Sequence, residues 1–386
     1  MKKKTKFRIL YFLSYLCEGF DYCFLITFLN VLGYSATEKS IILATGACIG
    51  IVIQFISGYL CDKNRTVKRY VYLFGVLYGI STVLVYAVGN YRPIFHMIMV
   101  PINVGLFRLM MGLFDNWIIE SDSDIARSFG SIRAFGSLGW AFGSYVGAYI
   151  IKLLGYFWMG ISSVIALALS LIFALDIKDV DKVANDKLKY GDIVKILGNP
   201  MYVLIVASMF VVTIAQSSLD MTVVDKYSYL HATENDVSLY WSITGILELP
   251  LFFLGEKLTD RFHPLSLFMF ATVIYGIRLF GYAGATSVEA MLWPSILQML
   301  SYPVMNLINK DLVLAETPEN LKSSGLQIGL ALYSTMSALF SPLIAGMLEQ
   351  RFDINVALYA IGSLSAVSLV MTCLYIALKK KSNVVS

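Results

Sequence analysis

Charged residues and histidines are scarce in this chain of 386 residues. Asp, Glu, Lys and Arg make up 15% of it, histidine occurs 3 times, and hydrophobic residues make up 58%. Soluble globular domains carry about a quarter charged residues. The composition therefore excludes a soluble globular protein and predicts an integral membrane protein in a lipid bilayer. The net charge of +4 is spread over short clusters between apolar runs, which excludes a nucleic-acid-binding domain.

Cysteine patterns and clustered catalytic residues are also missing. The five cysteines lie in or at the ends of apolar segments without CxxC spacing, so we expect neither disulfides nor a metal site, and no cofactor. No DxxxD cluster or Ser/His/Asp set occurs within the apolar segments. This argues against an enzyme, and a membrane-embedded enzyme is kept only as the alternative from another functional class. The basic N-terminus, "MKKKTKFRILYFLSYL", has no A-x-A cleavage site after it and is interpreted as the start of the first membrane helix.

Long apolar runs dominate what is present. Runs of about 18 to 25 residues predict about twelve membrane-spanning helices, near residues 8–32, 40–61, 70–89, 94–119, 130–153, 156–176, 200–225, 238–258, 264–284, 288–309, 323–348 and 355–378. A longer polar segment divides them into two similar halves. We therefore predict an all-α membrane protein with two pseudo-symmetric six-helix bundles, residues 1–176 and 200–386, joined by a linker at 177–199.

Basic residues collect in alternate loops of this arrangement. They lie in "MKKKTK", "DKNRTVKR", the linker, "EKLTDR" and the final "KKK". Because such loops remain on the cytoplasmic side, we expect a multi-pass protein of the cell membrane with both termini in the cytoplasm.

A few charged residues lie inside the predicted spans, where a charge is rare unless it is paired or functional. Those of interest are Glu18, Asp21, Asp115, Arg133, Asp220, Glu248 and Arg278. Glu18 and Asp21 are three residues apart and share one helix face near the middle of the bilayer.

Asp115 and Arg133 are predicted to lie at similar depth. Each is nine residues from Asp124, the centre of the loop between the fourth and fifth spans, so antiparallel neighbours would bring them together. Arg133 is about one turn inside its helix, however, and snorkelling to the headgroups is the alternative.

Glu248 and Arg278 are predicted to lie at similar depth in the second half, since each lies fifteen residues from His263 in the loop between the eighth and ninth spans. A static ion pair is the alternative to a functional one. Because none of the histidines is well placed inside a span, a proton carrier must be a carboxylate. The candidates are Glu18, Asp21, Asp220 and Glu248, with Glu248 the first choice and Asp21 the second.

The stretch "SGYLCDKNRTVKRY" resembles the loop motif between spans two and three of the major facilitator superfamily. Gly58, Asp62, Lys68 and Arg69 stand in the matching places, and the resemblance implies a gating role for them. The loop glycine of the motif is absent, with Arg65 and Thr66 in its place.

The stretch "FGSIRAFGSLGWAFG" resembles the fifth helix of the proton-coupled oligosaccharide symporters, the lactose permease group, and of related nucleoside and phenylpropionate symporters. The resemblance implies that Arg133 binds substrate, that Asp115 pairs with it, and that Trp140 is a stacking platform for a sugar ring. In the same way "TGILELPLFF" and "YGIRLFGYAG" imply that Glu248 is the second-half substrate carboxylate and Arg278 the arginine of the proton-coupling region.

One departure concerns the tenth span, where lactose permease carries a histidine and a glutamate in its proton site. Here "ILQMLSYPV" offers Gln298 and Ser301 instead. We keep Gln298 among the substrate-binding candidates.

Together these features predict a monomeric secondary active transporter that carries a sugar or glycoside with protons by alternating access. A nucleoside or aromatic-acid symporter and a drug/proton antiporter are the alternatives among transporters. Charged pairs in both halves favour a small polar substrate, whereas a Met-rich apolar cavity with one acid would favour drugs.

Overall fold

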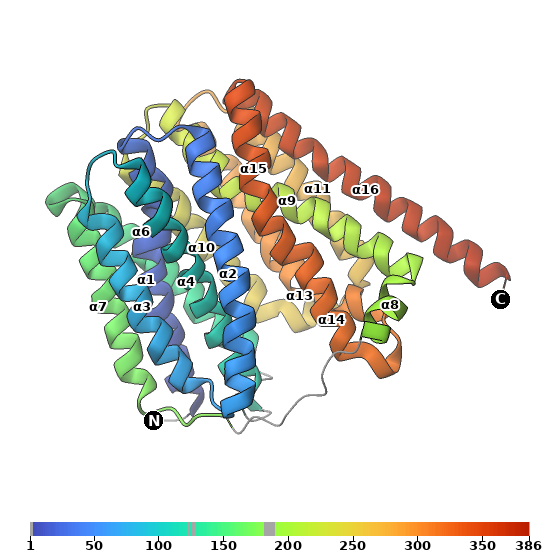
Figure 1. Ribbon diagram of the computed structural model, residues 1–386. Helices are drawn as coiled ribbons and strands as arrows, with labels where there is room; N and C mark the ends of the chain where they lie inside the picture. The colour runs from blue at the N-terminus through green and yellow to red at the C-terminus, as the bar shows by residue number, and fades with distance from the viewer. Residues whose placement is uncertain (1–2, 122–123, 126–127, 181–189, 386) are drawn as a thin grey trace. The chain divides into compact units, whose positions relative to one another are not determined.

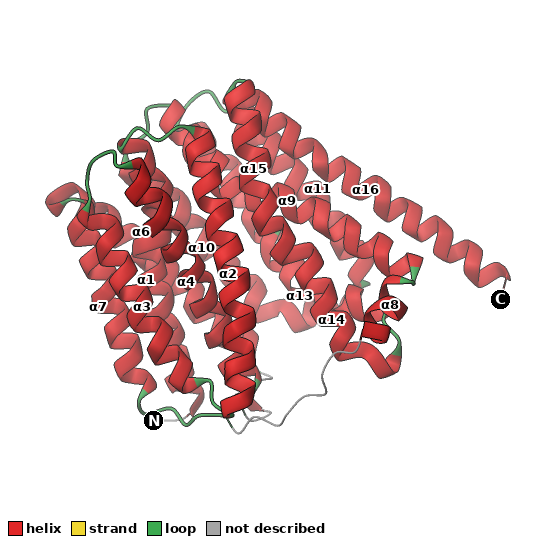
Figure 2. Ribbon diagram, in the orientation of Figure 1, coloured by secondary structure: helices red, strands yellow, loops and turns green. Residues whose placement is uncertain are grey.

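Helices make up the regular structure of the part of the chain that is described. The computed structural model describes residues 3–121, 124–125, 128–180 and 190–385, and the elements in these ranges are all helical (Figure 2). This confirms the prediction of an all-α membrane protein.

Ten helical segments among these residues are long and apolar enough to cross a membrane. They are α1 (Lys3–Val31), α2 (Ala36–Asn64), α3 (Lys68–Ala87), α4 (Pro93–Ile119), α7 (Tyr156–Ala174), α9 (Pro200–Tyr229), α10 (Glu234–Arg261), α11 (Pro264–Gly284), the stretch Ser324–Arg351, and α16 (Ile354–Val385). The stretch Ser324–Arg351 contains most of α14 (Lys322–Leu330), a π-helical turn at Ala331–Thr335, and α15 (Met336–Arg351).

Two of the expected spans are not among these ten. Helix α6 (Phe129–Leu154) is nevertheless a continuous helix of 26 residues, as long as several of the ten. The span expected at 288–309 is broken into a 3₁₀ turn (Glu289–Met291), α12 (Leu292–Ile296), a second 3₁₀ turn (Leu297–Leu300) and α13 (Tyr302–Ala315). Proline lacks the amide hydrogen that continues a helix, and Pro294 and Pro303 lie in this stretch.

The chain forms two compact units. Unit 1 comprises Met1–Ala184 and Tyr227–Phe253, and unit 2 comprises Asn185–Lys226 and Leu254–Ser386. A short helix, α8 (Tyr190–Leu197), lies within the expected linker, and residues 181–189 of that linker are outside the described residues. The bundle boundaries expected from the sequence remain a prediction.

In unit 1, α1 packs against α6 and α7, α2 against α4, and α3 against α4 and α7 (Figure 1). The contact between α1 and α6 is close because glycine lines it. A Cβ atom added at Gly143 would lie 2.6 Å from the carbonyl oxygen of Leu16. Small residues of this kind let two helix backbones approach within a membrane.

In unit 2, α11 packs against α16 and α13. Small polar residues also join α9 to α16, because the Ser208 hydroxyl lies 2.9 Å from that of Ser368 and 2.7 Å from that of Thr372. Such hydrogen bonds between helices satisfy hydroxyl groups that have no water around them.

Candidate functional site

Five residues of three helices in unit 1 come together around Arg133, and we call them the arginine cluster. They are Tyr11, Tyr15 and Glu18 on α1, Asp115 on α4 and Arg133 on α6. The Tyr11 hydroxyl donates a hydrogen bond to Asp115. The rings of Tyr11 and Tyr15 stack with centroids 5.6 Å apart. The Arg133 guanidinium carbon lies 4.4 Å from the centre of the Tyr15 ring, which is a cation–π contact.

Helix geometry explains why α1 supplies three of these residues. Tyr11, Tyr15 and Glu18 follow one another at spacings of four and three residues, which places them on one face of a helix. Gly136, one turn after Arg133 on α6, leaves room for this face. A Cβ atom at Gly136 would lie 2.9 Å from Cδ2 of Tyr15 and 3.2 Å from Nη1 of Arg133. Tyr15 and Arg133 therefore depend on a glycine for their contact.

The charges of the cluster act on one another. Arg133 is close enough to interact electrostatically with both Asp115 and Glu18. Asp115 and Arg133 thus belong to the same cluster, and the hydrogen bond to Asp115 comes from Tyr11. Glu18 is only 2% exposed, and its Oε2 atom has no hydrogen-bond partner among the described residues. A buried carboxylate in this situation is costly unless it is protonated or meets a cation.

Aromatic rings lie further along α6, around Trp140. Trp140 is seven residues from Arg133, which is two helical turns or about 10 Å along the same face. Its ring centroid lies 5.6 Å from that of Trp241 and 6.3 Å from that of Tyr22. Tyr22 in turn stacks on Phe107, with centroids 4.5 Å apart and an interplanar angle of 1°. Flat apolar rings therefore stand beside the charged cluster.

Glu248 lies on the part of α10 that belongs to unit 1. Ser137, one turn after Arg133 on α6, donates a hydrogen bond of 3.1 Å to Oε2 of Glu248. Phe252, one turn further along α10, has its ring centroid 6.0 Å from the Arg133 guanidinium carbon. This face of α10 therefore meets α6 at the level of the arginine cluster.

A second polar group surrounds Asp21, and we call it the Asp21 cluster. Asp21 is 1% exposed, and its Oδ2 atom accepts hydrogen bonds from the Tyr78 hydroxyl at 2.7 Å, the Thr82 hydroxyl at 3.2 Å and the Asn103 amide at 3.3 Å. Its Oδ1 atom has no hydrogen-bond partner in the described part of the chain. The Tyr86 hydroxyl donates to the main-chain oxygen of Asp21 at 2.8 Å. The cluster ties α1 to α3 and α4.

The remaining candidates lie in unit 2. Arg278 is 1% exposed and donates to the Ser301 hydroxyl at 2.9 Å and to the Pro294 carbonyl at 3.3 Å. Gln298 lies in the second 3₁₀ turn, and Asp220 is half-buried on α9. Because Glu248 belongs to unit 1 and Arg278 to unit 2, their pairing stays a prediction.

The residues of the loop motif lie at the end of α2 and the start of α3. Gly58 and Asp62 are on α2, and Lys68 and Arg69 begin α3. The Lys68 ammonium donates to the carbonyls of Leu175 at 2.8 Å and Ile177 at 2.7 Å, which follow α7.

Arg65 stands where the loop motif has a glycine, and the backbone conformation at this position explains why glycine is preferred. Arg65 has φ 51°, a left-handed conformation that favours glycine. It caps the end of α2 in spite of its side chain.

Asp179 completes this junction from beyond α7. Its Oδ1 atom accepts hydrogen bonds from the backbone N–H groups of Val67 and Lys68 at 3.1 Å each, and Thr66 donates its hydroxyl to the other oxygen. Partial burial acts to raise the pKa of Asp179, but these hydrogen bonds and that from the Val180 N–H outweigh it and lower the pKa.

Sequence reasoning missed Tyr11 and Tyr15, which contact Asp115 and Arg133, and Trp241, which contacts Trp140. The spacing of Tyr11, Tyr15 and Glu18 was a signal that could have identified the first two. As to metals, the described residues contain no group of three His, Cys, Asp or Glu side chains arranged to hold an ion.

Comparison with known proteins gives one family and many similar folds. A family model described as "MFS_1 like family" matches residues 4–360. A search of curated proteins finds no match. A solved structure of a mutant of the nucleoside transporter NupG aligns with a TM-score of 0.82 and 14% identity over 97% of this chain and 99% of that one.

Two peptide-transporter structures are similar as well. A POT family transporter in complex with a thioalcohol-conjugated peptide gives a TM-score of 0.75 and 13% identity over 98% of this chain and 96% of that one. A structure from a study of proton-dependent oligopeptide transporters gives 0.71 and 15% identity, over 97% and 98%. At these identities the likeness establishes a shared fold.

Proposed function

Since the chain belongs to the MFS_1-like family and is a transporter rather than an enzyme, we propose that it is a proton-coupled symporter of a sugar or glycoside that works by alternating access. The observation that carries this proposal is the arginine cluster, where the half-buried Arg133 guanidinium lies over Tyr15 within electrostatic reach of Glu18 and Asp115.

Arg133, Asp115 and Glu248 suit a substrate rich in hydroxyl groups. The planar guanidinium of Arg133 can donate to two oxygens at once, and the carboxylates of Asp115 and Glu248 can accept from hydroxyls. Trp140, two turns along α6, supplies a flat face for a sugar ring. Arg133, Asp115, Trp140 and Glu248 are therefore our substrate-binding residues, with Gln298 of unit 2 as a further candidate.

A nucleoside is the second candidate substrate. The pair of Trp140 and Trp241 favours it, since a nucleobase offers a second ring for stacking beside the ribose hydroxyls. The fold shared with the nucleoside transporter NupG also supports this candidate. Both substrates present hydroxyls to arginine and a ring to tryptophan, so the same site would serve either.

For proton coupling we propose Glu18 as the carrier among the candidate carboxylates. Its Oε2 atom has no hydrogen-bond partner among the described residues, and Arg133 is the cation that acts on it. A carboxyl group in such a site binds or releases a proton as the distance to the arginine changes. If substrate draws Arg133 toward itself, Glu18 takes up a proton, and transport of the two is linked. Glu248, Asp21, Asp220 and Arg278 remain candidates for the same pathway.

The test is uptake by proteoliposomes with an imposed pH gradient, using radiolabelled sugars, glycosides and nucleosides. We expect accumulation of one of these classes above its equilibrium level when the outside is acidic, and none without the gradient. Liposomes without protein and liposomes with Arg133→Lys protein are the controls. Accumulation that is independent of the gradient would contradict proton coupling, and uptake of apolar cations alone would favour a drug antiporter.

We further propose that the protein acts as a monomer in the cell membrane with both termini in the cytoplasm. The basic clusters at the two ends of the chain support this orientation. Reporter fusions at Ser386 and within residues 180–195 should both report the cytoplasmic side. Opposite sides would contradict it.

A further inference from the structure

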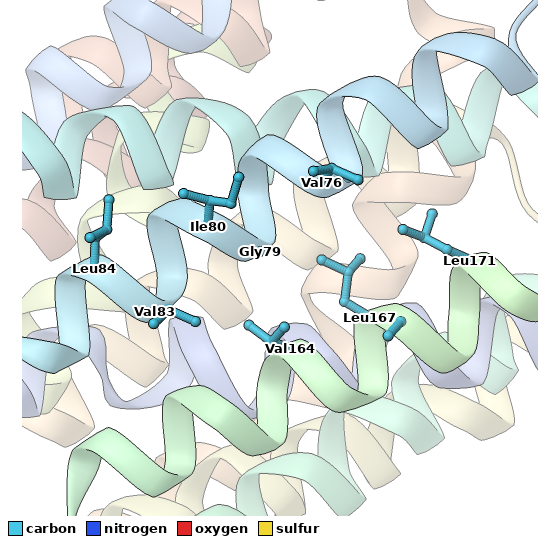
Figure 3. A pocket seen from close by; sticks show the side chains of 10 residues that line it. Val76, Gly79, Ile80, Val83, Leu84, Val164, Leu167 and Leu171 are labelled. Carbon is cyan, nitrogen blue, oxygen red and sulfur yellow. The ribbon is translucent and has the colours of Figure 1, made fainter.

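An apolar groove runs between α3 and α7 of unit 1, and none of its lining residues belongs to the arginine cluster (Figure 3). Its volume is about 420 Å³, and its lining consists of Gly, Ala, Val, Ile and Leu residues from the two helices. Val164, Leu167 and Leu171 extend from α7 toward α3 in this view. The groove is thus a hollow made by two neighbouring helices and holds no polar side chain.

Glycine explains the hollow. Gly75 and Gly79 lie one turn apart on α3 and face leucines of α7. A Cβ atom at Gly79 would lie 3.5 Å from Cδ2 of Leu167 and 3.7 Å from Cγ1 of Val164, which are ordinary contact distances. A methyl group would therefore fit beside Gly79.

The two helices that form the groove, α3 and α7, are long and apolar enough to lie in the hydrocarbon of a membrane. Along the groove Val76 is 56% and Ile80 is 53% exposed, so the described residues leave about half of each side chain uncovered. Inside a bilayer an apolar hollow is filled through dispersion contacts, and a flexible acyl chain can follow its shape.

A cation stands at one end of the groove. Arg69 is exposed and is seven residues before Val76, so it lies on the same face of α3, two turns or about 10 Å away. Two acidic residues that follow α7 are engaged elsewhere, since Asp176 pairs with Lys6 and Asp179 accepts backbone hydrogen bonds. Lys68 donates to two carbonyls, and this fixes the ends of α3 and α7 to each other.

We propose that this groove binds an acyl chain of an anionic phospholipid whose phosphate lies against Arg69. The order along α3, first a cation and then an apolar hollow, is the order of headgroup and chain in a phospholipid. A second copy of the protein fits less well. A two-fold axis along the membrane normal would bring the Arg69 side chains of both copies to the same depth, where they would repel each other.

The test is competition between phosphatidylglycerol and phosphatidylcholine with identical acyl chains, read by native mass spectrometry of the detergent-purified protein. We expect one phosphatidylglycerol molecule to be retained in preference. Arg69→Gln should reduce this preference about fivefold, since one basic residue near an anionic headgroup contributes about that factor. The matched control is Arg261→Gln, which removes an exposed arginine in unit 2 and should leave the preference unchanged.

The groove itself is tested at Gly79. Gly79→Leu should fill the hollow and remove the bound lipid, whereas Gly79→Ala adds only a methyl group that fits and should retain it. If Gly79→Leu does not fold, a lipid with a photoreactive acyl chain should label residues 76–84 and 164–171 of the unsubstituted protein. Equal retention of both lipids, labelling elsewhere, or loss of a dimer in place of a lipid on Gly79→Leu would overturn the proposal.

Discussion

Glu18 and Asp21 lie three residues apart on one face of α1, yet their carboxylates have different surroundings. Oδ2 of Asp21 accepts hydrogen bonds from neutral groups on α3 and α4. Glu18 lies within electrostatic reach of Arg133, and its Oε2 atom has no hydrogen-bond partner among the described residues. A carboxylate held by several neutral donors keeps its place, whereas one that depends on a single cation changes its protonation when that cation moves. Helix α1 thus carries one carboxylate suited to stabilising the fold, Asp21, and one suited to exchanging a proton, Glu18.

The neighbours of the two residues extend this comparison. The groups around Asp21 come from the packed core of unit 1, where Tyr78 and Thr82 are each 1% exposed. Arg133 and Asp115 are half-buried. A substrate that enters this region can reach Arg133 and Asp115 more readily than the Asp21 cluster. We therefore assign binding to these two residues and stabilisation to the Asp21 cluster.

Glu18→Gln is the most direct test of the different roles of Glu18 and Asp21. Glutamine has the same shape but carries no exchangeable proton, so we expect accumulation driven by a pH gradient to be abolished. Exchange of labelled for unlabelled substrate should continue, because binding does not need the proton carrier. Proteoliposome uptake and counterflow measure the two. Asp21→Asn is the matched control and should still accumulate substrate.

The reverse outcome, with accumulation by Glu18→Gln and none by Asp21→Asn, would exchange the two roles. Glu248→Gln in the same assay tests the carboxylate favoured by the sequence. Loss of accumulation in that variant alone would move the carrier from α1 to α10.

Arg133→Lys should have the next largest effect. Lysine keeps the charge but loses the planar fork that donates to two oxygens, and it loses the extended contact with Tyr15. We expect substrate binding to weaken by about 10- to 100-fold, which corresponds to about 1.5 to 3 kcal/mol for hydrogen bonds to a charged group. Direct binding of the transported substrate to folded, purified protein measures it.

Arg92→Lys, at an exposed arginine before α4, is the control for the same chemical change. Near-normal affinity of Arg133→Lys would support the snorkelling interpretation, since lysine reaches the headgroups as well as arginine does.

Asp21→Asn should have a smaller effect, and mainly on stability. An asparagine oxygen in the place of Oδ2 can still accept from Tyr78, Thr82 and Asn103. Its amide group then takes the place of Oδ1, which has no hydrogen-bond partner among the described residues, so a buried donor is left unsatisfied. We expect a loss of about 1 to 3 kcal/mol in the free energy of unfolding, the usual cost of a buried polar group left without a partner. Denaturation in detergent measures it. Glu18→Gln should show no comparable loss, and equal destabilisation of both variants would remove the distinction between the clusters.

Sequence spacing associated Asp115 with Arg133 but did not identify the other residues around them. Counting from the loop placed Asp115 and Arg133 in one region, and both lie in the arginine cluster. It could not show that Tyr11 donates to Asp115 or that Tyr15 lies under Arg133. Spacing along a chain gives the position of a residue along its helix. Which helix lies beside it, and how that helix is rotated about its axis, depends on packing between distant segments.

Two elements illustrate the same limit for the fold. Hydrophobic runs predicted a continuous span at 288–309, but the structure has short helices and 3₁₀ turns there, with Pro294 and Pro303 within the stretch. The bond between Ser137 and Glu248 joins residues 111 positions apart, and no local pattern predicts such a pairing. Composition determines which segments enter the membrane, whereas contacts between helices determine the site.

Asp179, after the end of α7, resembles Asp21 in that its carboxylate accepts hydrogen bonds from neutral donors. It accepts from the N–H groups of Val67 and Lys68 at the start of α3, where the residue before the helix supplies no side-chain cap of its own. Asp179→Asn should therefore reduce stability at pH 7 by about 0.5 to 1 kcal/mol, the lower part of the range for helix caps, because Asp179 is exposed to solvent.

The pH dependence of this contribution has a definite sign. The hydrogen bonds lower the pKa of Asp179 in the folded protein below its unfolded value of about 3.9. The stabilisation is therefore fully present above the unfolded pKa and is lost as the pH falls through the folded pKa. In thermal unfolding, the difference in Tm between the unsubstituted protein and Asp179→Asn should be constant from about pH 5 to 7 and shrink below about pH 4.

Asp311→Asn, at an exposed aspartate of α13, is the control and should show little difference in Tm from the unsubstituted protein at any pH. A difference for Asp179→Asn that grows on acidification would mean that the charge of Asp179 opposes the fold and that the cap contributes nothing.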